Sequence, residues 1–146
     1  MDFIRKAKET DLARIAEIEI FNYRLNFYPI FKNDDFYFDE LSVPVYMEEI
    51  RPRLERMFVY DDGVVKGFIS VDGQRVDKLF VEPVLQGRGI GAKLLDYAVQ
   101  NLGADELWAL EKNERAIAFY TRHGFRLTAD KKPEEDTSEF LVRLKR

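Results

Sequence analysis

Cysteine is absent from this chain of 146 residues, and histidine occurs once, at His123. Without thiols there is no disulfide, no thiolate zinc site and no cysteine nucleophile, and a single histidine excludes a multi-histidine metal centre. Serine occurs only at Ser42, Ser70 and Ser138, none of them in a Gly-x-Ser-x-Gly elbow. The sequence therefore predicts no metal site, and catalysis, if present, without a covalent protein intermediate.

Long apolar runs and an excess of basic residues are also missing. No segment has the length and hydropathy of a membrane span and no signal peptide opens the chain, so we expect a cytoplasmic protein with no membrane partner. With 27 acidic against 23 basic residues the net charge is −4, which argues against a nucleic-acid partner. The length predicts one domain, residues 1–146, with a hydrophobic core large enough to be stable without a metal ion or disulfides.

The hydrophobic periodicity predicts seven strands and four helical segments. Residues 21–46, rich in aromatic and acidic side chains, are the least regular part. The strands are expected at 3–7, 57–60, 64–71, 76–82, 106–110, 125–129 and 140–144. The helices are expected after an N-cap at Thr10, at 46–57 with an interruption at Pro52, at 90–102 and at 113–122. This order predicts an α/β (α+β) fold: a mixed, mostly antiparallel central sheet of about seven strands with helices on both faces.

Residues 76–92 predict a strand, a glycine-rich turn and the start of a helix. Gly87, Gly89 and Gly91 let the backbone curl, so that N–H groups at the helix start can point at one phosphate. The alternative is that these glycines serve turn geometry only. A Walker loop would end in Gly-Lys-Ser/Thr, and the dinucleotide fingerprint needs Gly-x-Gly-x-x-Gly; neither is present. The turn therefore favours a phosphate-bearing ligand other than one bound by a Walker loop or by a dinucleotide-binding fingerprint.

Two motifs resemble the GNAT family of acetyl-CoA-dependent N-acetyltransferases. The first is Leu-Phe-Val-Glu-Pro-Val-Leu-Gln-Gly-Arg-Gly-Ile-Gly-Ala at 79–92, and the second is Asn-Glu-Arg-Ala-Ile-Ala-Phe-Tyr-Thr-Arg-His-Gly-Phe at 113–125. Gln86, Gly89 and Gly91 fill the family's Gln/Arg-x-x-Gly-x-Gly/Ala pyrophosphate loop. The element order resembles the family along nearly the whole chain, although residues 21–56 match only in kind.

The resemblance implies acetyl-CoA as cosubstrate and assigns its contacts. In the family a bulged strand pairs with the pantetheine arm, which here falls on 79–81. The implied cofactor-binding residues are Leu79, Phe80, Val81, Gln86, Gly87, Arg88, Gly89, Ile90, Gly91, Ala92, Asn113 and Tyr120.

The same resemblance assigns catalytic roles. Tyr120 is expected to be the general acid that protonates the departing thiolate, and the backbone N–H of Val81 to meet the oxyanion. The two functional side chains of the second motif, Asn113 and Tyr120, could instead have purely structural roles. Asn113 can be only a helix N-cap, and Tyr120 only an aromatic core residue.

The general base is less well determined. Some family members carry a glutamate five residues before the asparagine, where this chain has Trp108. Glu111 is the candidate that we carry forward, and Glu82 is the other nearby carboxylate. A water chain to bulk solvent, or an acidic residue of the irregular segment such as Asp34 or Asp35, is equally open. His123 is expected to be structural, because it lies at a helix end.

The predicted function is transfer of an acetyl group from acetyl-CoA to a primary amine by direct attack in a ternary complex. The alternative is a non-catalytic acyl-CoA-binding or regulatory module, and a third possibility is a phosphate-ligand domain unrelated to CoA. The acceptor is expected to be a small-molecule or peptide amine, and the chain a monomer or a homodimer.

Overall fold

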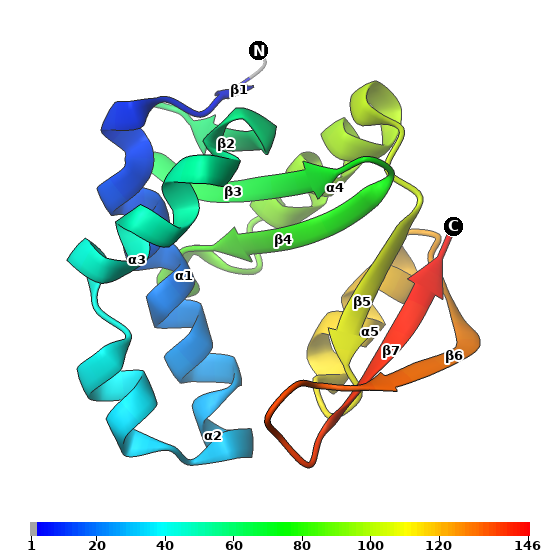
Figure 1. Ribbon diagram of the computed structural model, residues 1–146. Coiled ribbons are helices and arrows are strands. Elements are labelled where there is room, and N and C mark those ends of the chain that lie inside the picture. The colour runs from blue at the N-terminus through cyan, green and yellow to red at the C-terminus, as the bar shows by residue number, and fades with distance from the viewer. Residues whose placement is uncertain (1–2) are drawn as a thin grey trace.

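The computed structural model describes residues 3–146, which form one seven-stranded sheet with helices on both of its faces (Figure 1). The strand order is β1-β2-β3-β4-β5-β7-β6. The strands are β1 Ile4–Lys6, β2 Met57–Asp61, β3 Val65–Asp72, β4 Arg75–Val81, β5 Glu106–Leu110, β6 Arg126–Pro133 and β7 Phe140–Lys145. Every neighbouring pair is antiparallel except β4 and β5, which are parallel. The predicted mixed, mostly antiparallel sheet is confirmed.

The helices form in the predicted order. They are α1 Leu12–Asn26, α2 Tyr28–Phe31, α3 Val43–Ile50, α4 Ile90–Leu102 and α5 Glu114–Arg122. α4 has the predicted bounds, and it ends because Gly103 adopts a left-handed conformation with φ of 71°. α5 begins where the Asn113 side chain accepts a hydrogen bond from the Ala116 N–H at 3.2 Å.

Several expected boundaries were wrong. Thr10 is not an N-cap: residues 9–11 form a 3₁₀ turn and α1 starts after Asp11, whose carboxylate accepts from the Lys8 N–H at 2.8 Å. The interruption expected at Pro52 is confirmed: α3 starts at Val43 rather than at 46 and ends at Ile50, and Pro52 lies in the first turn of a separate 3₁₀ helix, Arg51–Arg56. The segment expected to be irregular continues α1 to Asn26 and includes α2 and a π-helix at Asp35–Glu40.

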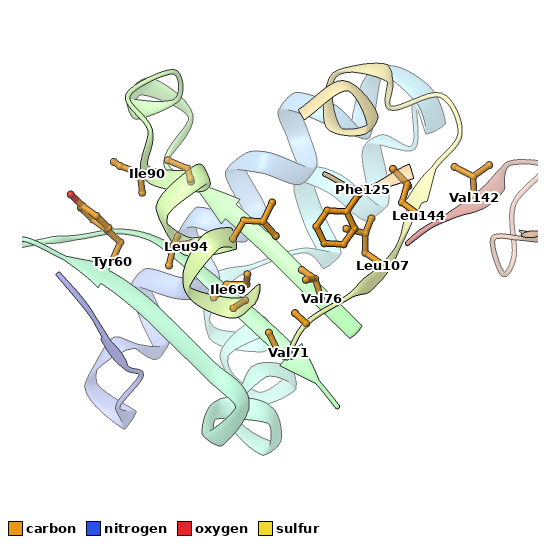
Figure 2. Close-up of a cluster of buried hydrophobic side chains, with 14 residues drawn as sticks. Tyr60, Ile69, Val71, Val76, Ile90, Leu94, Leu107, Phe125, Val142 and Leu144 are labelled. Carbon is orange, nitrogen blue, oxygen red and sulfur yellow. The ribbon is translucent and has the colours of Figure 1, made fainter. Parts of the chain in front are cut away.

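Two hydrophobic clusters hold the layers together, one on each face of the sheet. The first packs α4 onto the strands that flank the β4–β5 junction, and Figure 2 shows Leu94 of α4 close to Ile69 of β3. The same cluster reaches Phe125, which precedes β6 and is 1% exposed. The second cluster packs α1 and α3 against the opposite face, around Phe68. β4 therefore has a hydrophobic cluster on each of its two faces, and packing on both faces fixes its place in the sheet.

No helix within residues 3–146 is long and apolar enough to cross a membrane. The same residues contain no group of three or more histidine or acidic side chains that could hold a metal ion.

Candidate active site

The site is built where β4 and β5 separate. These parallel strands are paired only at their first residues, Arg75 with Glu106 and Val76 with Leu107. Beyond that point they diverge, as the open wedge between the green and yellow strands in Figure 1 shows. A strand that loses its neighbour presents unpaired N–H and C=O groups, which an amide-bearing ligand can satisfy. The second half of β4 is such an edge.

A bulge precedes this free edge. Lys78 pairs with Ser70 of β3, but Val76 pairs with Val71, so Asp77 is an extra residue in β4. Farther along, the Glu82 N–H donates to the Lys66 carbonyl at 2.9 Å, which shows that Glu82 faces β3. Because backbone groups alternate in direction along a strand, those of residues 79 and 81 face the wedge. The bulge that the resemblance implied is therefore present, and the N–H of Val81 faces the open side.

The glycine turn leads from β4 into α4. Gly87 and Gly89 have φ values of 85° and 83°, a region that favours glycine, and an added Cβ on either would meet no atom within 4 Å. Gly89 is the N-cap of α4, a helix of 13 residues, so the free N–H groups of its first turn lie beside the wedge. These groups carry the positive end of the helix dipole, which suits a phosphate.

The second motif forms the opposite wall. Asn113, Ala116 and Tyr120 all line the same cleft, as their spacing on one helix face predicts. Asn113 caps α5 through its side-chain oxygen, which leaves its amide nitrogen available to a ligand. Tyr120 packs edge-on against Phe119 and Phe125, and its hydroxyl makes no hydrogen bond to any described residue.

Together these elements enclose a cleft of about 380 Å³. Eleven of the twelve cofactor-binding residues predicted from the sequence line it, and Arg88 alone does not. The sequence reasoning missed seven lining residues: Asn22, Asn26, Leu85, Arg115, Phe119, Arg122 and His123. The seven-residue spacing of the two arginines on α5 could have identified them as a cationic pair on one face.

Gln86 lies in the cleft wall, but its side chain is directed into the protein. Its amide nitrogen donates to Asn22 Oδ1 at 2.9 Å and to the Val81 carbonyl at 3.3 Å. Asn22 Nδ2 donates to the same carbonyl at 2.8 Å. The side chain of Gln86 is therefore occupied by the protein itself, and only its backbone is left for a phosphate.

The Tyr120 phenol is half-buried in the cleft wall, and burial raises its pKa well above the ordinary value of 10. The group is therefore a neutral hydrogen-bond donor throughout the physiological range. Burial also makes it a weaker acid than a phenol in water.

The candidate bases Glu111 and Glu82 do not line the cleft that Tyr120 lines. Glu111 is exposed, pairs with Lys131 at 2.8 Å and does not line the cleft. Glu82 is held by Arg14 at 2.8 Å. Among the described residues that line the cleft there is no aspartate or glutamate. The structure thus does not bring Glu111 together with the other predicted catalytic groups.

Neither Asp34 nor Asp35 lines the cleft. Asp34 accepts a hydrogen bond from the Tyr28 hydroxyl. Trp108, which stands where some family members carry a glutamate, is covered by the Lys132 ammonium group 4.2 Å from its ring centroid. His123 lines the cleft and packs against Phe119 with their ring centroids 4.6 Å apart, and its structural role stays a prediction.

A buried polar cluster lies on the α1 side of β4. Glu19 of α1 is fully buried, and its Oε2 atom accepts hydrogen bonds from Tyr23, Tyr46 and Lys78. Burial, followed by the negative charge of Glu19, raises the pKa of both phenols. This cluster joins α1 and α3 to the strand that forms the free edge.

The architecture agrees with known proteins. A family model described as an acetyltransferase (GNAT) domain matches residues 53–127, which is about half of the chain and includes both motifs. The chain belongs to the GNAT family. Its match spans the free edge of β4, the glycine turn and α5, the three elements that line the cleft.

Two curated GNAT relatives and one solved structure illustrate the similarity. The chain is 36% identical to the peptidyl-lysine N-acetyltransferase YjaB of Escherichia coli over 62 residues, which are 42% of each chain, so the match spans less than half of that relative. It is 28% identical to the peptidyl-lysine N-acetyltransferase YiaC of Escherichia coli, over 85% of this chain and 83% of the relative. The structure of the PaiA N-acetyltransferase of Thermoplasma acidophilum with coenzyme A has a TM-score of 0.75 at 20% identity, and covers 98% of both chains.

Proposed function

We propose that the protein is an N-acetyltransferase that transfers an acetyl group from acetyl-CoA to a primary amine by direct attack in a ternary complex. The observation that carries the proposal is the cleft between β4 and α5. It combines an unpaired strand edge, a helix N-terminus approached through a glycine turn, and a phenol without a hydrogen-bond partner among the described residues. Those three features suit the amide-bearing arm, the pyrophosphate and the departing thiolate of one ligand.

The chain's residues would hold acetyl-CoA by backbone groups for the most part. The N–H and C=O groups of Leu79 and the N–H of Val81 face the wedge, where they can pair with the pantetheine amides. The first turn of α4 suits the pyrophosphate, because it presents N–H groups and the positive end of the dipole. Arg115 and Arg122 add cationic side chains at the rim of the cleft. Bound acetyl-CoA supplies the thioester that the amine attacks.

Two groups would stabilise the charges that develop during transfer. The Val81 N–H would donate to the thioester oxygen as negative charge builds on it. The Tyr120 hydroxyl would donate to the sulfur as the carbon–sulfur bond breaks, and proton transfer would complete the departure of CoA as a thiol. Because burial raises the pKa of Tyr120, its ionisation does not limit the reaction at neutral pH.

Removal of the amine proton would proceed without a carboxylate in the cleft. No acidic side chain is among the described residues that line it, so a water path to solvent is the route that we propose. Only the neutral amine is a nucleophile. The rate should therefore increase with pH up to the pKa of the acceptor amine.

For the acceptor we propose the side-chain amine of a peptidyl lysine. The support is that two relatives, YjaB and YiaC, are named as peptidyl-lysine N-acetyltransferases. A lysine side chain also has the reach to enter a cleft while its own backbone stays at the surface.

The test is release of CoA thiol from acetyl-CoA in the presence of lysine-containing peptides, with small amines and a peptide blocked at every amine as comparisons. We expect thiol release that depends on the peptide, with the mass of one acetyl group added at lysine. CoA binding without turnover on any amine would contradict the proposal and leave a binding module.

The same assay tests the role of Tyr120. Tyr120→Phe keeps the ring and removes the hydroxyl, so we expect turnover to fall by about tenfold or more while CoA affinity stays close to that of the unmodified protein. Unchanged turnover in this variant would show that the phenol is not the proton donor.

A further inference from the structure

Asn22 of α1 uses the whole hydrogen-bonding capacity of its side chain at the interface with β4. It is 1% exposed. Its amide nitrogen donates to the Ile18 carbonyl at 2.9 Å and to the Val81 carbonyl at 2.8 Å. Its oxygen accepts from Gln86 Nε2 at 2.9 Å and from Asn26 Nδ2 at 3.5 Å. A carboxamide has two donors and two acceptor positions, and all are filled here.

These bonds hold the last peptide group of β4 from both ends. The carbonyl of Val81 is bound by Asn22 and Gln86, and the N–H of Glu82 in the same peptide donates to the Lys66 carbonyl at 2.9 Å. The orientation of this group is therefore determined from α1 on one side and from β3 on the other. The N–H of Val81, which faces the cleft, belongs to the adjacent peptide and takes its direction from the anchored one.

The Asn22 side chain also reaches the glycine turn. Gln86, which binds its oxygen, lies three residues before Gly89, the N-cap of α4. One buried carboxamide thus connects the free edge of β4 with the loop that leads to the helix N-terminus. A hydrocarbon side chain at this position would leave the Val81 carbonyl and the Gln86 amide short of a partner.

We propose that Asn22 is a positioning residue, which sets the cleft edge of β4 and the glycine turn in the spacing that CoA requires. This inference rests on the proposed function, since it assigns Asn22 a part in the same site. Asn22 acts through Val81 and Gln86 and needs no contact with the reacting atoms. It should therefore affect the affinity for CoA more than the affinity for the acceptor amine.

The test is Asn22→Asp. Aspartate has nearly the same shape and still accepts from Gln86, but when ionised it cannot donate, and it places a carboxylate oxygen against the Val81 carbonyl. We expect the dissociation constant of CoA, measured by calorimetry, and the KM for acetyl-CoA to rise about tenfold, the scale of one lost buried hydrogen bond. The KM for the lysine peptide should change by less than about twofold.

Asn101→Asp is the matched control. Asn101 donates to the carbonyl four residues earlier, that of Tyr97, at 3.2 Å, just as Asn22 does to Ile18, but it is exposed and does not line the cleft. This variant should keep the CoA affinity of the unmodified protein. If Asn22→Asp does not fold, Gln86→Met decides, because it breaks the link from the loop side at a half-buried position, and we expect it to weaken CoA binding severalfold.

The possible outcomes separate the two ideas. Unmodified protein that binds CoA, together with folded Asn22→Asp protein of equal CoA affinity, refutes the positioning role alone. A lower melting temperature with unchanged CoA affinity also refutes it, since that is what a purely structural residue would give. Unmodified protein that binds no CoA refutes the proposed function and this inference with it.

Discussion

Replacing Lys78 by methionine should destabilise the protein strongly, because it leaves the carboxylate of Glu19 buried without a counter-charge. Glu19 has no exposed side-chain surface, and the Lys78 side chain is 18% exposed. Methionine fills nearly the same volume as the lysine stem, so packing is little altered. The change therefore isolates the electrostatic and hydrogen-bonding part of the interaction.

Breaking a buried ion pair from one side costs about 3–5 kcal/mol. Domains of this kind are stable by about 5–15 kcal/mol, so the loss would be about a fifth of the total or more. Removing both charges should cost far less. In a Glu19→Leu, Lys78→Met double variant the Tyr23 and Tyr46 hydroxyls can bond to each other, because their oxygens are already 3.1 Å apart. We expect its stability to lie within about 1–2 kcal/mol of the unmodified protein, or above it.

The assay is urea unfolding followed by tryptophan fluorescence and by circular dichroism, with the free energy of unfolding compared across the two single variants and the double variant. Lys112→Met is the control, because Lys112 pairs with Glu139 at 3.1 Å but is 64% exposed, and exposed pairs contribute little. A Lys78→Met variant that loses no more stability than this control would refute the reasoning. So would a double variant that is less stable than both single variants.

Three further predictions concern the cleft and the dependence on pH. Gly89→Ala should weaken CoA binding strongly, because φ is 83° there and the helix N-terminus must shift to accept a Cβ. Its control is Gly73→Ala, where φ is 63° in a remote hairpin: this variant should lose a similar amount of stability but keep the CoA affinity of the unmodified protein in the same titration. Arg122→Gln should weaken CoA binding severalfold, by an amount that shrinks as salt is added; an effect independent of salt would contradict a phosphate contact. Hydrogen bonding from the Arg5 guanidinium lowers the pKa of Asp11 below its ordinary 3.8, so the stability that this carboxylate contributes is present above pH 3.8 and is lost as pH falls below it. Asp11→Asn should therefore destabilise the protein more at pH 7 than at pH 3, as measured by unfolding at both values.

Much of the fold follows from local signals in the chain. Helix α4 has its predicted bounds because both of its ends are encoded locally, by a glycine that adopts positive φ at residue 89 and another at residue 103. The cap at Asn113 is equally local, since the side chain bonds an N–H three residues ahead. The start of α1 was predicted wrongly at Thr10, because Asp11 accepts hydrogen bonds from Arg5 and from the Lys8 N–H and so stabilises a 3₁₀ turn over residues 9–11.

The candidate site was predicted in outline for the same reason. The glycine turn and one face of α5 are short motifs whose residues lie close in sequence, so their spacing alone brings Asn113 and Tyr120 to one side of a helix. Glu111 was predicted as the base, but the structure leaves it outside the cleft. Its direction depends on β6, which supplies its partner Lys131 from 20 residues away in the chain, and no local pattern reports that pairing.

The sequence by itself determined the order of the strands and helices, the glycine turn that can hold a phosphate, and the face of α5 that accompanies it. These features depend on side-chain periodicity and on backbone conformations that only certain residues adopt, so the residues that determine each feature lie within a few positions of one another in the sequence. Only the tertiary structure decided that β4 and β5 separate after two residue pairs, and that Asn22 binds the carbonyl of Val81 across 59 positions of sequence. Such contacts depend on how the two cores pack against β4 from opposite faces, and that packing exists only in the folded chain.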